Sequence, residues 1–324
     1  MRGRAVAAVG VALLLFGAAA PSPAADELRI GKAAAVGFSF GVLDVGIAQG
    51  FYKDAGIDIE ELNFSGAAKV EQGIAAGAVD IGLSAGTDLA LIVKGVPAKG
   101  VAALAGPPYD IAVIVGKGSP IGTLDDLKGK RTSAATAGGS MMEWMAKELA
   151  RVKGWPPDSI TVVAVGVERT GKVAALRTHA VDALYDAPGL AFELEKTGEG
   201  KLLALASDYV KDFMVHGIYA SNALIAQNPE ALRRFLAAWF KTIAFMRTHR
   251  AETVAVMGKV TGEGDALAGR EYDLEMPMFS SDGRFDPAAL KKLSDSFVEL
   301  KMLDHPVDLA PYVTEKFLPV KSGS

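Results

Sequence analysis

Short apolar runs alternate with longer amphipathic segments along most of the chain, and this alternation is the feature that most limits how it can fold. Strand-like runs at residues 28–34, 57–63 and 80–83 are each followed by a helical pattern. Strands that alternate with helices in this way form βαβ units, in which neighbouring strands pair in parallel. The sequence therefore predicts an α/β fold.

The chain contains two sets of alternating strands and helices, with one connection near 106–109 and a return near 216–220. Residues 106–109 read Gly-Pro-Pro-Tyr, which suits neither a helix nor a central strand. A second set of strands and helices then leads to an apolar run at 216–220. We expect two lobes joined by two crossing strands, with a ligand cleft between them. The first lobe would be built from 26–108 and 217–324, and the second from 109–216.

After the second crossing the pattern is largely helical. A long amphipathic helix is predicted over 229–248, with Asn228 as its N-cap and Pro229 in its first turn. Further helices are expected at 251–259, 287–301 and 309–317.

The first residues have the order of regions found in a secretory signal peptide. Arg2 and Arg4 precede a stretch without charge from 5 to 20, and small residues follow. A spanning helix needs about 20 apolar residues, so this stretch is too short to be one. We expect a signal peptide over 1–25, cleaved near Ala24, and a mature protein in a periplasm-like space.

Cysteine and charge content exclude several classes of site. The chain has no cysteine, which rules out disulfides, thiolate catalysis and thiolate metal ligands. Without Arg2 and Arg4, the 34 Lys and Arg fall to 32 against 38 Asp and Glu, a net charge of −6. With no basic face and no long run of like charge, no nucleic-acid partner is expected.

Several motifs occur in a fixed order along the chain. They begin with Ile-Ala-Gln-Gly-Phe-Tyr-Lys-Asp-Ala-Gly-Ile at 47–57 and continue with Gly-Ala-Val-Asp-Ile-Gly at 77–82. Leu-Asp-Asp-Leu-Lys-Gly-Lys follows at 124–130, and Pro-Met-Phe-Ser-Ser-Asp-Gly-Arg at 277–284. The ordered set resembles the substrate-binding proteins of the nitrate, sulfonate and taurine class of ABC transporters.

The resemblance implies a type II-like periplasmic-binding-protein fold that closes its lobes on a small molecule. It also implies a monomer that docks on the membrane subunits of an ABC permease and spans no membrane itself. A periplasmic sensory protein with the same scaffold is the alternative, and a secreted enzyme is a third. The ligands of such proteins include sulfonates, nitrate, aromatic acids and pyrimidines, and we expect a small organic solute of sulfonate or carboxylate type.

Loops that follow strands are the candidate ligand contacts in the first lobe. Two aromatic rings and a hydroxyl in the first loop suit an organic ligand, although the same residues would fit a turn packed on the core. The serine before the next helix, and the threonine of the third loop, could instead be helix caps. The candidates are Phe38, Ser39, Phe40, Ser65, Gly66, Ser84, Gly86 and Thr87.

In the second lobe, glycines before a helix are typical of an anion site, because unpaired N–H groups point outward there. This loop comprises Thr136, Gly138, Gly139 and Ser140, and a turn capped by Ser140 is the alternative. Asp186 after a strand could bind a donor or cap a helix. At the crossings, Tyr109 and His216 could face the cleft or make a buried hydrogen bond between the lobes.

Catalytic motifs are missing from the sequence. The four histidines are dispersed, and neither a His-Glu-x-x-His pair nor a Gly-x-Ser-x-Gly elbow occurs. A related branch of the family makes a thiamin pyrimidine precursor with a cysteine-rich motif, which a chain without cysteine lacks. We therefore expect a binding protein that is not an enzyme and needs no metal or cofactor.

Overall fold

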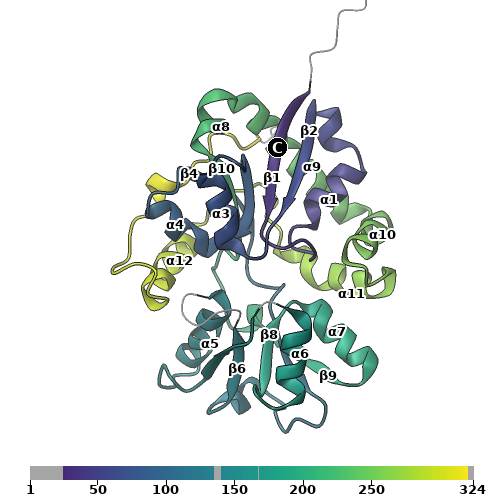
Figure 1. Ribbon diagram of the computed structural model, residues 1–324, viewed down its shortest axis with the longest axis vertical. Helices are drawn as coiled ribbons and strands as arrows, with labels where there is room; N and C mark the ends of the chain where they lie inside the picture. The colour runs from purple at the N-terminus through teal and green to yellow at the C-terminus, as the bar shows by residue number, and fades with distance from the viewer. Residues whose placement is uncertain (1–24, 135–139, 167, 320–324) are drawn as a thin grey trace, which may run out of the picture.

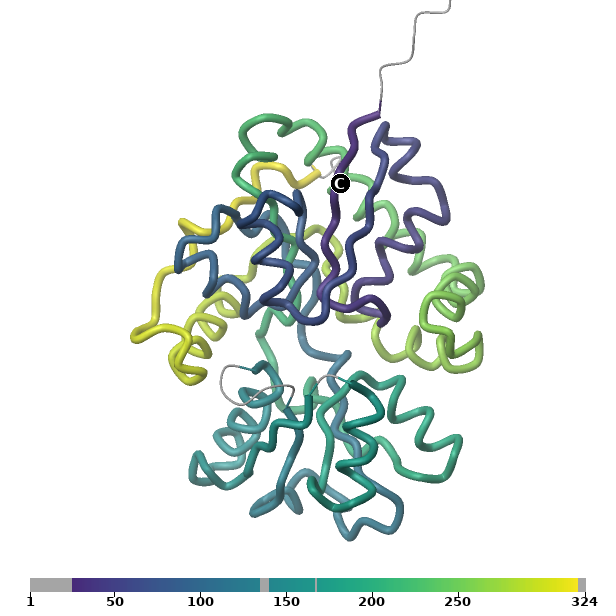
Figure 2. The backbone as a smooth tube through the Cα atoms, in the orientation of Figure 1, coloured from purple at the N-terminus to yellow at the C-terminus, as the bar shows by residue number. Residues whose placement is uncertain are grey.

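Two five-stranded sheets, one in each of two lobes, organise the chain (Figure 1). The computed structural model describes residues 25–134, 140–166 and 168–319. The expected signal peptide thus lies outside the described residues, except for its last position. Figure 2 shows the chain passing between the upper and lower lobes twice. Within the described part of the chain, no helix is both long and apolar enough to cross a membrane.

The sheet of the upper lobe has the strand order β2-β1-β3-β10-β4. β1 pairs in parallel with β2 and β3, as the βαβ pattern predicts, whereas β10 runs antiparallel between β3 and β4. The strands are β1 (Asp26–Lys32), β2 (Ile57–Asn63), β3 (Ile81–Ala85), β4 (Ala98–Ala105) and β10 (His216–Ser221).

The sheet of the lower lobe repeats this plan with the order β7-β6-β8-β5-β9. β6 is parallel to β7 and β8, and β5 is antiparallel to β8 and β9. In both sheets the fourth strand, β10 or β5, is the one that follows a crossing from the other lobe. The strands are β5 (Ala112–Gly116), β6 (Arg131–Ala134), β7 (Thr161–Ala164), β8 (Ala183–Asp186) and β9 (Gly200–Leu205).

Helices follow the strands and cover both sheets (Figure 1). The long helix α9 begins as predicted, because the Asn228 side chain accepts a hydrogen bond from the Ala231 N–H at 3.1 Å. The helices before the last crossing are α1 (Gly41–Ala48), α2 (Phe51–Asp54), α3 (Ala67–Ala75), α4 (Leu89–Val93), α5 (Met141–Val152), α6 (Arg169–Arg177) and α7 (Pro188–Thr197). Those after it are α8 (Asn222–Gln227), α9 (Pro229–Thr248), α10 (Arg250–Thr261), α11 (Asp265–Glu275) and α12 (Pro287–Glu299).

The C-terminal part differs from the sequence prediction in two places. The helix expected over 309–317 is wrong, since only the short 3-10 turn Ala310–Tyr312 forms, and Pro311 within it can donate no backbone hydrogen bond. The prediction also missed α11. Its buried side chains include Leu267, Glu271 and Glu275, and acidic residues at buried positions conceal the amphipathic pattern.

The lobes share apolar contacts on two flanks. On one flank, Trp144 of α5 stacks on Phe213 of the second crossing, with ring centroids 4.4 Å apart. On the other flank, Leu267 and Leu274 of α11 join the apolar cluster of the lower lobe, which includes Leu190 of α7. A helix that follows the upper-lobe helices in sequence thus closes the core of the lower lobe.

Candidate functional site

The carboxyl ends of the parallel strands place the candidate site between the lobes. The arrowheads of β1 and β2 point toward the lower lobe in Figure 1. In the lower lobe, β8 ends at Asp186 and leads into α7, which packs against α11 of the upper lobe. Loops at the carboxyl ends of both sheets therefore meet at the boundary between the lobes, where open α/β sheets bind ligands.

Three side chains from distant parts of the sequence meet at this boundary. Asp110, in the first crossing, accepts a hydrogen bond from the Ser39 hydroxyl at 2.6 Å. The same carboxylate oxygen lies 2.5 Å from Nε2 of His216, at the start of β10. The ring of Phe40 lies edge-on to the His216 imidazole, with centroids 4.9 Å apart. We call Ser39, Asp110 and His216 the junction cluster, because it ties the loop before α1 to both crossings.

The junction cluster keeps its carboxylate charged. Burial favours the neutral acid, but the charge of His216 and the hydrogen bonds from His216 and Ser39 outweigh it, so the pKa of Asp110 is lowered. Two polar atoms of the cluster, Oδ1 of Asp110 and Nδ1 of His216, are buried and make no hydrogen bond with the described residues. Buried polar atoms are nearly always paired, so these two positions suit a bound polar group.

The predicted contacts on β3 and the turn after it lie inside the upper lobe. Ser84 is fully buried and donates its hydroxyl to Asp88, and Thr87 is buried beside it. Burial raises the pKa of Asp88 to about 7, although the Ser84 hydrogen bond and His216 lower it. Gly86 donates its N–H to the Val215 carbonyl at 2.8 Å. Through Gly86, this turn of the upper lobe is bonded to the second crossing.

The first loop is packed on the core, which is the alternative that its sequence left open. Phe38 is 2% exposed, with ring centroids 6.2 Å from Tyr272 and 5.9 Å from Phe279. Ser65 is exposed, but it is not the helix cap that its position suggested. The N-cap of α3 is Gly66, which adopts a φ of 104° and leaves no side-chain cap.

The predicted contacts of the lower lobe are only partly described. Thr136, Gly138 and Gly139 lie outside the described residues. Ser140 caps α5 by accepting a hydrogen bond from the Glu143 N–H at 3.4 Å, as its alternative role predicted.

Asp186 lies at the end of β8 and Tyr109 in the first crossing. Asp186 forms an ion pair with Lys172 of α6 at 2.8 Å and accepts the Ala187 N–H, so it does not cap α7. Tyr109 is half-buried and its N–H bonds to the Pro107 carbonyl at 2.9 Å.

Sequence reasoning missed Asp110 and Lys172. Asp110 lies 71 residues from Ser39 and 106 from His216 along the chain, so no local spacing connects them. Its position next to Tyr109 in the first crossing was the one available signal. Lys172 supplies the cation that the loops themselves lacked, from the first turn of a helix.

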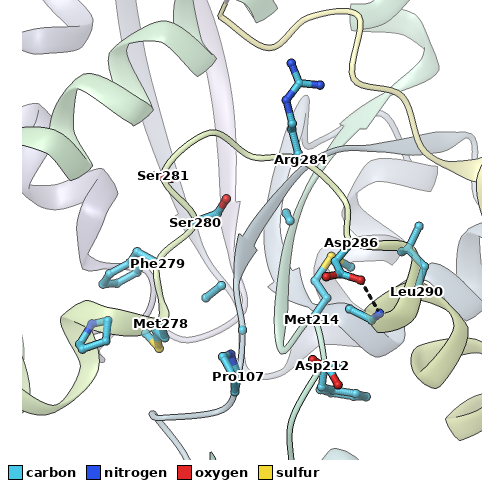
Figure 3. A pocket seen from close by; sticks show the side chains of 16 residues that line it. Pro107, Asp212, Met214, Met278, Phe279, Ser280, Ser281, Arg284, Asp286 and Leu290 are labelled. Carbon is cyan, nitrogen blue, oxygen red and sulfur yellow. Dashed lines mark hydrogen bonds between the residues drawn. The ribbon is translucent and has the colours of Figure 1, made fainter. Parts of the chain in front are cut away.

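A cavity of about 380 Å³ lies behind the crossings (Figure 3). Pro107 of the first crossing and Asp212 and Met214 of the second line it, together with Ser280 and Arg284 of the C-terminal segment. Both crossings thus form walls of one space. Among the described residues, no three His, Asp or Glu side chains are grouped so that they could hold a metal ion.

Comparison with protein families and curated proteins gives two matches. A family model described as NMT1/THI5 like matches residues 38–253. A curated protein of Candida albicans, named 4-amino-5-hydroxymethyl-2-methylpyrimidine phosphate synthase, is 25% identical over 221 residues. That alignment covers 65% of this chain and 64% of the relative, so the chain spans less than two thirds of the relative's length.

Solved structures share the fold. The alkanesulfonate-binding protein SsuA of Xanthomonas axonopodis pv. citri, bound to MOPS, is 20% identical with a TM-score of 0.74, covering 91% of this chain and 99% of that one. The desulfurization enzyme DSZB is 16% identical with a TM-score of 0.60, covering 90% and 97%. These similarities confirm the two-lobed periplasmic-binding-protein fold expected from the sequence, on which both binding proteins and enzymes occur.

Proposed function

The chain belongs to the NMT1/THI5-like family, and from this premise we propose that it is a periplasmic solute-binding protein of an ABC importer. It captures a small organic solute between its lobes and delivers it to the membrane subunits of the permease. The junction cluster is the observation that carries this proposal. Because Asp110 bonds both the loop before α1 and the second crossing, a ligand that completes this cluster favours one angle between the lobes.

Groups in both lobes support an organic ligand with an acidic end. Phe40 supplies an aromatic surface beside His216. In the lower lobe, Lys172 pairs with Asp186 at 2.8 Å, so the carboxylate at the end of β8 is neutralised and does not repel an acidic ligand. The dipole of α5, whose N-terminus is capped by Ser140, also favours an anion, against the charge of Glu143 in its first turn. We therefore propose a carboxylate or sulfonate solute.

A thermal-shift panel on the mature protein tests the proposal. It would compare organic acids, sulfonates, amines and pyrimidines. A ligand at 100 times its Kd stabilises the folded state by about 2.7 kcal/mol, which raises Tm measurably. His216→Gln should abolish the shift given by the best ligand, whereas the exposed histidine variant His249→Gln should retain it. Stabilisation by amines alone would reject the acidic ligand, and an unchanged shift in His216→Gln would reject the site.

An enzymatic role is the second candidate, favoured by the synthase name of the Candida albicans relative and by the shared fold of DSZB. The experiment is incubation of each stabilising compound with the protein, followed by mass spectrometry. Unchanged ligand after many hours supports binding and release. Conversion of the ligand, lost in His216→Gln, would replace the transport role with catalysis.

A further inference from the structure

A carboxylate group forms a hydrogen bond between the lobes on the flank formed by α7 and α11. Glu271 of α11 is 3% exposed, and its carboxylate accepts the backbone N–H of Gly189 at the N-terminus of α7. Space for this contact exists because residue 189 is glycine, since a Cβ there would lie 2.3 Å from Oε1 of Glu271. The contact joins a helix of the C-terminal region directly to the lower lobe.

Acidic groups outnumber cations around this contact. The side chains of Glu263, Glu271 and Glu275 are all buried, and that of Glu263 is 6% exposed. Arg169 of α6 bonds Glu263 at 3.2 Å, but it also pairs with Glu193 of α7 at 2.7 Å. Oε2 of Glu271 and Oε2 of Glu263 are buried without a hydrogen-bond partner among the described residues. The other charged groups that act on this set are Arg169, Glu193 and Asp110, and Asp186 acts in turn on Arg169.

The opposite flank shows how a buried acid is neutralised elsewhere in the same molecule. Glu148 of α5 is 1% exposed, like the acids beside α7. It is held by two hydrogen bonds from Arg151, at 2.6 and 2.7 Å, and lies 3.5 Å from Lys292 of α12. The flank between α5 and α12 therefore matches its acid with cations, and the flank between α7 and α11 does not.

We propose that joining the lobes through α7 and α11 takes up a proton on the cluster of Glu263, Glu271 and Glu275, so that the lobes separate as the pH rises. A protonated Glu271 still accepts the Gly189 N–H and gains an O–H that Glu263, whose Oε2 has no hydrogen-bond partner among the described residues, can accept. Once ionised, the cluster repels itself inside a contact that water does not reach.

The acid-base properties of the group agree in direction. Burial, and next the charge of Glu263, raise the pKa of Glu271 to about 8, against the opposing effect of Arg169. Burial likewise raises the pKa of Glu275, and Glu271 and Asp110 add to it. A raised pKa means that the joined state binds the proton more tightly. The bound proton stabilises the joined state fully below the ordinary glutamate pKa of about 4.3, and this stabilisation is lost as the pH rises to about 8.

The influence of Asp110 on Glu275 connects this flank to the junction cluster. The charge of the junction cluster thus contributes to the acid-base properties of this flank. One coupled proton changes the ratio of joined to separated lobes by up to about tenfold per pH unit inside this window.

The absence of cysteine makes the test direct, because two introduced cysteines are the only sites for thiol labels. Lys53→Cys and Asp158→Cys place labels on exposed positions of the upper and lower lobes. The distance between them is measured by double electron–electron resonance from pH 5 to 9. We expect a population with longer distances to grow as the pH rises, and Glu271→Gln to remove this change and keep the lobes joined.

Glu195→Gln is the matched control at the same contact. It removes the ion pair with Arg270 at 2.7 Å, but the pKa of Glu195 is lowered, because its bonds from Arg270 and the Leu202 N–H outweigh burial. It should shift the populations equally at every pH and leave the pH dependence intact. If Glu271→Gln does not fold, Glu263→Gln should weaken the dependence, since it removes a repelling charge. A distance distribution that is constant from pH 5 to 9, or a full dependence in a folded Glu271→Gln or Glu263→Gln, overturns the proposal.

Discussion

Two glycines, Gly86 in the turn after β3 and Gly106 in the first crossing, determine how closely these segments approach the second crossing. A Cβ on Gly86 would lie 2.0 Å from the Met214 carbonyl oxygen, and one on Gly106 would lie 2.0 Å from the Phe213 carbonyl oxygen. Both obstacles are backbone atoms, which cannot rotate away as a side chain can. The distance of closest approach to the second crossing is thus fixed by these two glycines.

Gly86→Ala should therefore lower the free energy of unfolding by about 1–3 kcal/mol, or more, through overpacking. Denaturation with guanidinium chloride measures this loss. Gly122→Ala is the control, because the added Cβ would meet only a side-chain oxygen of Asp126 at 3.9 Å. Equal stability of the two variants would show that the second crossing can move away from the turn after β3 at little cost.

Asp110→Asn should lower the free energy of unfolding by about 1–3 kcal/mol at pH 7, because the buried His216 and Ser39 lose a charged acceptor. The pKa of Asp110 is lowered, so its contribution is present above the ordinary aspartate pKa of about 3.9 and is lost as the pH falls through its own lower value. Denaturation of both proteins at pH 7 and pH 3 measures the difference. A gap that stays constant down to pH 3 would contradict an ionised Asp110.

At the scale of elements, both lobes anchor their first parallel strand in the same way. Arg29 on β1 donates from its backbone N–H and its guanidinium to Asp80, and Arg131 on β6 does so to Asp182. Each aspartate lies 51 residues after its arginine. The turns before the two aspartates differ in one respect: the left-handed position is Gly77 in the upper lobe but His179, with a φ of 55°, in the lower lobe.

His179→Gly should stabilise the protein by up to about 1 kcal/mol, because glycine takes this conformation without the strain of a Cβ. Gly77→Ala is the reciprocal variant and should destabilise by a similar amount. Urea denaturation of the two variants beside the parent protein checks both signs. Destabilisation by His179→Gly would mean that the exposed imidazole makes contacts worth more than the strain.

The elements were more predictable than the site. Alternating apolar runs predicted β1 and β2, and the break at Gly106 and Pro107 predicted the first crossing, because these signals are local. The α11 helix escaped prediction because its buried face carries Glu271 and Glu275, whose burial depends on the opposite lobe. His216 and Ser39 were candidates, but their shared partner Asp110 depends on how the crossings fold back, which no single segment specifies.

At the scale of the whole molecule, buried acids set how stability depends on pH. Burial, and then Asp88, raise the pKa of Glu71 to about 9, and that of Asp88 is raised to about 7 by burial. Such groups stabilise the fold fully below their ordinary pKa of about 4 and lose this effect as the pH rises through the folded values. Stability should therefore decline from pH 5 toward pH 9.

Glu71→Gln should flatten this decline by up to about 1.4 kcal/mol per pH unit, the effect of one proton. Free energies of unfolding at pH 5, 7 and 9 provide the comparison. Glu60→Gln, at an exposed position of β2, should keep the slope of the parent protein. The same slope in Glu71→Gln and in the parent protein would show that Glu71 takes up no proton on folding.

The position of α11 also bears on the order in which the protein is made. The lower lobe has its last strand, β9, complete at Leu205, yet Leu267 and Leu274, which close its apolar cluster, come much later in the chain. As domains form during synthesis from the N-terminus, this lobe leaves the ribosome with part of its apolar surface uncovered. A nascent chain stopped before α11 would present that surface to chaperones, and release from them would await the C-terminal helices.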